Sequence, residues 1–116
     1  MHKNNQLQEL IKELKKASIT NDAPVWKAVA ERLEKPTRQR PIVNLAGINR
    51  STKQGDVIVV PGKVLGDGDL DHSVTVAALG FSQSATLKLK ESKAVTATIT
   101  DLVKKDPKGK SVRVLA

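Results

Sequence analysis

The chain has 116 residues, the size of one domain, and it contains no cysteine, which excludes disulfides and thiolate chemistry. Its formal net charge is +8, from 20 basic and 12 acidic residues. One tryptophan, one phenylalanine and no tyrosine are present, so a base-stacking platform built from several aromatic rings is not expected. No apolar run approaches the roughly twenty residues of a membrane span, and the polar N-terminus does not resemble a secretory signal. We therefore expect a cytoplasmic protein without membrane attachment.

Residues 1–36 are predicted to form an N-terminal segment of two amphipathic helices arranged as a hairpin. The first, over residues 5–18, has its apolar side chains at the i, i+3, i+4, i+7 spacing that places them on one face: Leu7, Leu10, Ile11 and Leu14. In the second helix, Asp22 is the expected N-cap, Pro24 lies in the first turn and Pro36 ends the helix. Its apolar face has the same spacing: Trp26, Val29, Ala30 and Leu33.

The most distinctive stretch begins directly after these helices. Residues 35–53 contain five basic side chains and no acidic one: Lys35, Arg38, Arg40, Arg50 and Lys53. Four of the five arginines in the chain fall between residues 32 and 50. Arginine binds phosphate through two parallel hydrogen bonds, whereas a solubilising surface can use lysine equally well. The distribution therefore favours a polyanionic partner over simple solvation.

Residues 37–116 are predicted to form an α/β core, continuous with the helices as one domain. A short strand at residues 42–43 precedes a helical turn capped by Asn44. Residues 56–60 and 63–65 are predicted strands joined by a type II turn at Pro61-Gly62. A strand at residues 74–79 is followed by a helix capped by Ser82, although the alternation of residues 85, 87 and 89 also suits a strand. A strand at 95–98, a helix capped by Thr100 and a strand at 112–115 complete the chain.

Three patterns imitate functional sites without completing them. Asp67, Asp69 and Asp71 match the start of a calcium loop, but the glycine and glutamate that the loop requires further on are absent. Residues 109–111 end like a phosphate-binding P-loop, but the required preceding glycine is missing and a strand is predicted to follow. His2 and His72 have no recognisable nucleophile or metal-binding partner. We expect no catalytic residue, cofactor or metal ion.

Several stretches resemble the large-subunit ribosomal protein eighteen-e family of archaea and eukaryotes, which is related to the C-terminal domain of bacterial large-subunit ribosomal protein fifteen. They are residues 26–33 (WKAVAERL) with Lys35-Pro36, Val43-Asn44-Leu45 with Ile48-Asn49-Arg50, residues 56–66 (DVIVVPGKVLG), and Val76-Ala77-Ala78 followed by Phe81-Ser82. The resemblance covers nearly the whole chain, and residues 59–66 are its most specific part. At residues 91–94 the chain has Glu-Ser-Lys-Ala where family members often have an Ala-Gly-Gly turn.

The resemblance implies a compact single α/β domain of irregular strand-strand-helix repeats, preceded by the N-terminal helical segment. It implies a structural component of the large ribosomal subunit, in contact with large-subunit ribosomal RNA and neighbouring ribosomal proteins, and it implies no catalysis. Carried over by position, it puts five side chains against RNA: Arg38, Arg40, Arg50, Lys53 and Lys63.

We therefore predict a ribosomal RNA-binding protein of the large subunit that acts through arginine and lysine contacts to phosphate, without a small-molecule substrate. The predicted RNA-binding residues are Arg32, Lys35, Arg38, Arg40, Arg50, Lys53, Lys63, Lys108 and Lys110; the last two form a second basic segment, for which a solvated surface is the alternative. One rival function is a stand-alone DNA-binding module, which would need a recognition helix instead of a proline-bounded basic loop. The other is a small enzyme acting on an anionic substrate, which would need a paired acid and base.

Overall fold

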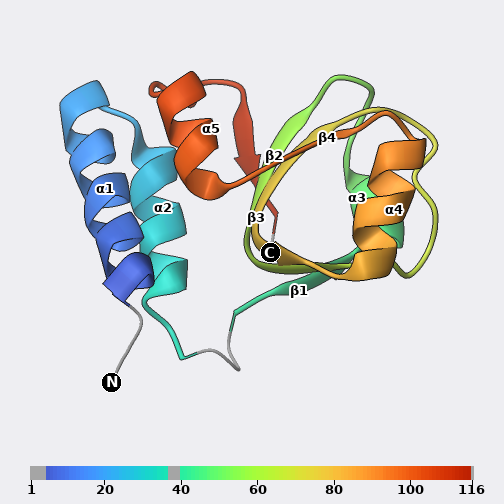
Figure 1. Ribbon diagram of the computed structural model, residues 1–116. Helices are drawn as coiled ribbons and strands as arrows, with labels where there is room; N and C mark the ends of the chain where they lie inside the picture. The colour runs from blue at the N-terminus through green and yellow to red at the C-terminus, as the bar shows by residue number, and fades with distance from the viewer. Residues whose placement is uncertain (1–4, 37–39, 116) are drawn as a thin grey trace.

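The computed structural model describes residues 5–36 and 40–115 (Figure 1). Within them the chain forms helices and a parallel sheet, which confirms the predicted α/β class. The elements in chain order are α1 (Asn5–Asn21), α2 (Pro24–Leu33), β1 (Ile42–Asn44), α3 (Leu45–Ser51), β2 (Val57–Leu65), β3 (Thr75–Phe81), α4 (Gln83–Glu91), β4 (Val95–Ala97), α5 (Ile99–Lys105) and β5 (Val112–Val114). No helix in the described ranges is long and apolar enough to cross a membrane.

Strand β2 is the centre of the five-stranded sheet, and each strand pairs in parallel with its neighbours. Strand β3 runs along one edge of β2 and pairs with β4 on its own far edge. The other edge of β2 is shared, because β5 pairs with its first residues and β1 pairs with its last. The run of valines predicted to be a buried strand is therefore covered on both edges.

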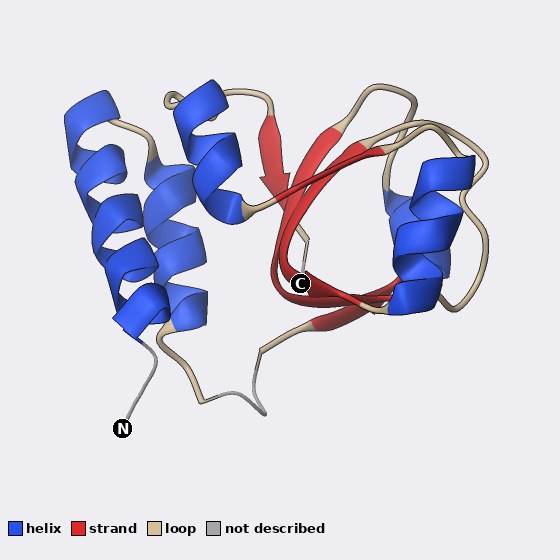
Figure 2. Cartoon of the chain, viewed as in Figure 1, coloured by secondary structure: helices blue, strands red, loops and turns tan. Residues whose placement is uncertain are grey.

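Helices lie on both sides of the sheet (Figure 2), and the sheet separates two hydrophobic cores. Because successive side chains of a strand point to opposite faces, Val59 and Ala77 pack with α1, α2 and α5. Ile58 and Val76, one residue earlier in each strand, pack with α3 and α4 on the other side. Each N-terminal helix thus buries its apolar stripe against the sheet or against its partner helix.

The predicted turn at Pro61-Gly62 is wrong, because β2 continues unbroken from Val57 to Leu65. Adjacent parallel strands cannot be joined by a two-residue turn, since the chain must first return to the opposite end of the sheet. Pro61 and Gly62 instead form a bulge: Val60 pairs with Ala78, whereas Lys63 pairs with Gly80, so two residues of β2 face one of β3. Proline, which lacks an N–H, is tolerated at such a point.

Two of the predicted helix caps are also wrong. Asp22 has a φ of 51° and lies in the turn after α1, which extends to Asn21; the N-cap of α2 is Ala23, which makes no side-chain capping bond. Helix α5 is capped by Thr98, whose hydroxyl accepts a hydrogen bond from the Asp101 amide, and not by Thr100. The Asn44 and Ser82 caps are confirmed, and residues 83–91 are a helix.

Candidate nucleic-acid interface

The first group of predicted cations lies at the C-terminal end of α2. The guanidinium of Arg32 donates to the Ala28 carbonyl oxygen at 3.4 Å, and Lys35 is exposed just after the helix. Arg40 lies at the same end of α2 and donates from Nη2 to the Leu33 carbonyl oxygen at 3.3 Å. The last carbonyls of a helix have no partner within it and attract cations, so Arg40 also stabilises the end of α2.

Arg40 is therefore less available to bind a ligand than a fully solvent-exposed arginine would be. It is partly buried, and its Nε is a buried atom without a hydrogen-bond partner among the described residues. Arg38, the other arginine predicted for this loop, lies outside the described residues.

A second group of cations gathers after α3. Arg50, in the last turn of that helix, and Lys53 are both exposed. Arg113 reaches them from β5, where its Nη1 donates to the Ser51 carbonyl oxygen at 3.1 Å and lies 3.3 Å from Asp56 Oδ2. The Asp56 carboxylate also accepts from the Lys53 backbone amide at 2.9 Å, and thereby fixes the turn that presents the lysine.

Lys63 comes from the centre of the sheet and is exposed directly after the β2 bulge. Its backbone amide donates to the Pro41 carbonyl oxygen at 3.1 Å, and its side chain lines one hollow together with that of Arg40. The sheet pairing therefore brings together two cations that are more than twenty positions apart in the sequence.

The third group, Lys108 and Lys110, lies at the opposite end of α2. The turn that presents them is held by Trp26, whose indole Nε1 donates to the Pro107 carbonyl oxygen at 2.6 Å. Gly109, with a φ of +59°, packs directly against the ring of Trp26. A helix of ten residues is about 15 Å long, so these lysines do not join the group at the other end of α2. Residues 109–111 lead into β5, as predicted, and not into the helix of a P-loop.

The aspartate-rich loop between β2 and β3 is held by a lysine of α4. In the parts of the chain that the structure describes, no three histidine, cysteine, aspartate or glutamate side chains are grouped to hold a metal. The ammonium of Lys88 instead donates to the Gly66 and Gly68 carbonyl oxygens at 2.9 and 2.8 Å, and lies 3.8 Å from Asp69 Oδ1. A cation supplied by α4 therefore already binds the carbonyl oxygens of this loop.

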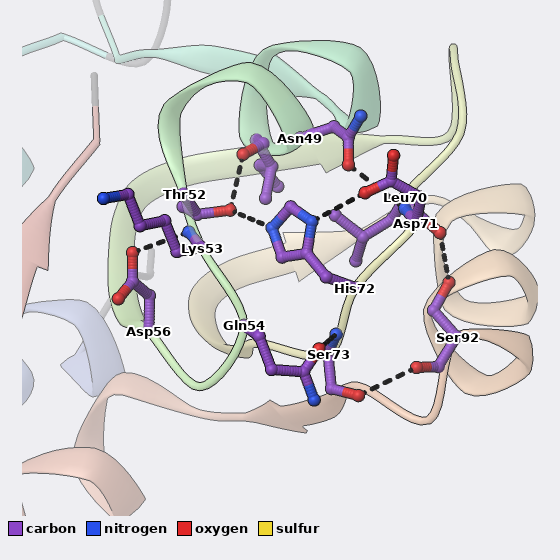
Figure 3. Close-up of polar contacts among 11 residues, drawn as sticks. Asn49, Thr52, Lys53, Gln54, Asp56, Leu70, Asp71, His72, Ser73 and Ser92 are labelled. Carbon is purple, nitrogen blue, oxygen red and sulfur yellow. Dashed lines mark hydrogen bonds and ion pairs between the residues drawn. The ribbon is translucent and has the colours of Figure 1, made fainter.

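His72 fastens the end of the same loop to α3 (Figure 3). The Thr52 hydroxyl donates to the Ile48 carbonyl oxygen at 2.7 Å, and the same hydroxyl oxygen lies 2.7 Å from His72 Nε2. The other ring nitrogen of His72 lies 2.8 Å from Asp71 Oδ1, and this hydrogen bond holds the pKa of the Asp71 carboxyl below its ordinary value. His72 thus has a structural role that its isolation in the sequence did not indicate.

The predicted cations that the structure describes are consequently brought to separate parts of the molecule and not to a single pocket. Lys88, Arg113 and His72 also have roles that the predicted site did not include. An alternation of polar and apolar residues signals which face of an element is exposed, but it does not signal which distant carbonyl oxygens a lysine reaches.

Comparison of the sequence with named proteins supports one family assignment. No protein-family model matches the chain. It is 50% identical over 112 residues to large ribosomal subunit protein eL18 of Methanoregula boonei, covering 97% of this chain and 93% of the relative. It is 47% identical over 116 residues to the protein of the same name from Archaeoglobus fulgidus, covering 99% of each. The corresponding protein of Pyrobaculum aerophilum is 46% identical over 112 residues, covering 97% and 92%. With such identity over nearly its full length, the chain belongs to the family of large ribosomal subunit protein eL18.

Proposed function

We propose that the chain is a structural constituent of the large ribosomal subunit in the cytoplasm, where it binds and stabilises large-subunit ribosomal RNA. Arginine and lysine contacts to phosphate supply the binding. The family is one of ribosomal structural proteins and not of enzymes. Its partners are accordingly the large-subunit RNA and neighbouring proteins of the subunit.

The availability of the predicted cations is the observation that carries the RNA-binding proposal. Among the described residues, six predicted cations are exposed and have no ion-pair partner: Lys35, Arg50, Lys53, Lys63, Lys108 and Lys110. Lys15 and Arg113, by contrast, are paired with Glu34 and Asp56. Phosphates can therefore reach the six side chains without first breaking an internal ion pair, while condensed counterions are released from the RNA.

The scaffold lowers the entropic cost of these contacts. Lys53 is presented by a turn fixed on Asp56, Lys63 by a bulge at the centre of the sheet, and Lys108 by a turn fixed on Trp26. Groups held on rigid elements lose less conformational freedom on binding than groups on a mobile tail. A-form RNA presents its phosphates and 2′-hydroxyls more openly than its bases, which suits cations that are separated from one another.

A charge-matched pair of variants tests this proposal. The double variant Arg50→Gln/Lys53→Gln removes two predicted phosphate contacts, and neither side chain makes a hydrogen bond within the described residues. We expect it to bind large-subunit ribosomal RNA about tenfold or more weakly in a filter-binding titration, because a hydrogen bond to a charged group contributes about 1.5 kcal/mol or more. Its urea unfolding midpoint should match that of the parent.

The control is Lys90→Gln/Lys93→Gln, which makes the same charge change at exposed positions in and just after α4. If the control loses as much affinity as Arg50→Gln/Lys53→Gln, net charge alone drives binding and the assigned residues are wrong. Competition with duplex DNA separates the remaining rival, since a DNA-binding module would prefer the DNA.

A further inference from the structure

Arg113 is the arginine whose contacts join strand β5 to the end of α3. Its Nη1 donates to the Ser51 carbonyl oxygen at 3.1 Å and lies 3.3 Å from Asp56 Oδ2. Among the described residues, neither Nε nor Nη2 of this side chain has a hydrogen-bond partner. The side chain is also 57% exposed to solvent. One nitrogen therefore anchors the guanidinium, and the other two can still donate to a ligand.

The anchoring contacts leave one complete edge of the Arg113 guanidinium unoccupied. In this planar group Nη1 lies on the side of Cδ, whereas Nε and Nη2 share the opposite edge and direct their N–H groups in parallel. Two parallel N–H donors match two oxygens of one phosphate group. Because the ion pair with Asp56 uses Nη1, it does not have to break before the other edge binds an anion.

Arg113 is held beside two cations that the proposed function assigns to RNA. Ser51, whose carbonyl oxygen accepts from Arg113, directly follows Arg50 in the chain. Asp56, the ion-pair partner of Arg113, also accepts from the Lys53 backbone amide at 2.9 Å (Figure 3). Arg50 and Lys53 are exposed and have no ion-pair partner in the part of the chain that the structure describes. The three cations outnumber the one carboxylate that orders them.

We propose that Arg113 binds one phosphate of large-subunit ribosomal RNA through its Nε–Nη2 edge, beside the contacts of Arg50 and Lys53. The inference rests on the proposed function and adds to it a residue from the last strand of the chain. Asp56 and the Ser51 carbonyl oxygen fix the guanidinium, so it loses less conformational freedom on binding than an unattached arginine would. An RNA strand fits better than a single carboxylate of a neighbouring protein, because it supplies successive anions to all three cations.

Filter-binding titrations of the full chain with large-subunit ribosomal RNA test the contact. We expect Arg113→Gln to weaken binding about tenfold and to make the slope of log affinity against log salt shallower by about one. Arg113→Lys keeps the charge but lacks the fork, so it should weaken binding about threefold or more without changing the slope. Lys90→Gln removes the same charge at an exposed position of α4 and should leave both quantities nearly unchanged. Parent-like affinity of Arg113→Lys, or an equal loss in Lys90→Gln, would overturn the inference.

A triple variant separates a phosphate contact from a purely structural role of Arg113. If Arg113 only held residues 51–56 in place, its replacement would act through Arg50 and Lys53 alone. Adding Arg113→Gln to Arg50→Gln/Lys53→Gln should weaken RNA binding by a further factor of about five or more, because Arg113 itself contacts the RNA. Urea unfolding confirms that each variant is folded under the binding conditions.

The absence of any further loss in the folded triple variant would overturn the inference. If Arg50→Gln/Lys53→Gln still binds more weakly than the parent in that case, the proposed function stands and only the assignment of Arg113 has failed.

Discussion

At the scale of single residues, Gly62 is the glycine with the least room for a side chain. A Cβ there would overlap the Pro41 carbonyl group, so backbone and not a flexible side chain would have to move. We expect Gly62→Ala to lower the free energy of unfolding by about 2–3 kcal/mol, as overpacking of a tight site does. Urea unfolding followed by the fluorescence of the buried Trp26 measures this loss.

Gly80 provides a matched control on the neighbouring strand. A Cβ at Gly80 would meet no heavy atom within 4 Å, so Gly80→Ala should change the free energy of unfolding by no more than about 0.5 kcal/mol. Similar losses for the two variants would contradict the close approach of the β2 bulge to the chain before β1.

Asp71 makes the stability of the folded protein depend on pH. Its hydrogen bond from His72 lowers the pKa of the carboxyl in the folded state relative to the unfolded chain. The folded state is therefore favoured above the ordinary aspartate pKa of about 3.9, and this contribution is lost as the pH falls through the lower folded-state value. We expect Asp71→Asn to reduce the difference in urea midpoint between pH 7 and pH 3. An unchanged difference would mean that the bond between the two side chains is not maintained in solution.

At the scale of elements, Lys88 links α4 to the loop that follows β2. Its ammonium satisfies two loop carbonyl oxygens, and Lys88→Met removes both hydrogen bonds while it keeps the aliphatic stem. Because the ammonium is partly exposed, we expect a loss of about 1–2 kcal/mol in the free energy of unfolding. Amide hydrogen exchange should quicken at the Ala46 amide, which donates to the Asp67 carbonyl oxygen of the same loop.

Lys90→Met on the same helix serves as the comparison, because Lys90 is exposed and its side chain makes no hydrogen bond within the described residues. If both methionine variants are equally stable, the loop is held by its backbone contacts alone.

Most of the elements follow from local pattern, and the errors arise where distant contacts decide. The stripe of α2 and the caps of α3 and α4 were predictable because each depends on residues within one or two turns. The Pro61-Gly62 pair is typical of a turn, but pairing with β3 and β1 makes it a bulge in a continuous strand. Thr98 and Thr100 are equally good capping residues by type, and the end of β4 determines which is used.

The candidate site likewise has features that were predictable from the sequence and features that were not. The exposure of Lys53 was predictable from its place in a polar loop. The way in which Lys63 is presented was not, because it depends on the β2 bulge. The partial engagement of Arg40 at the end of α2 was not, because it depends on the chain returning to the Leu33 carbonyl group. Nor does the sequence indicate that Arg113, far along the chain, approaches the end of α3.

At the scale of the whole molecule, the available cations are distributed over both ends of α2, the end of α3 and the centre of the sheet. A chain that contacts RNA through all of these places must neutralise more phosphates than one that uses a single patch. The salt dependence of binding counts them, because each neutralised phosphate releases a condensed counterion.

With about six phosphates contacted, the logarithm of the affinity for large-subunit ribosomal RNA should fall against the logarithm of salt concentration with a slope of about −4 to −5. Lys108→Gln/Lys110→Gln should make this slope shallower by about two, and Arg50→Gln/Lys53→Gln should do the same independently. Filter-binding titrations over a salt series measure all three slopes. A parent slope near zero would contradict phosphate binding, whereas a slope altered by only one of the two variants would confine the RNA to one end of the molecule. Additive changes require an RNA surface that follows the protein from the turn beneath Trp26 to the end of α3.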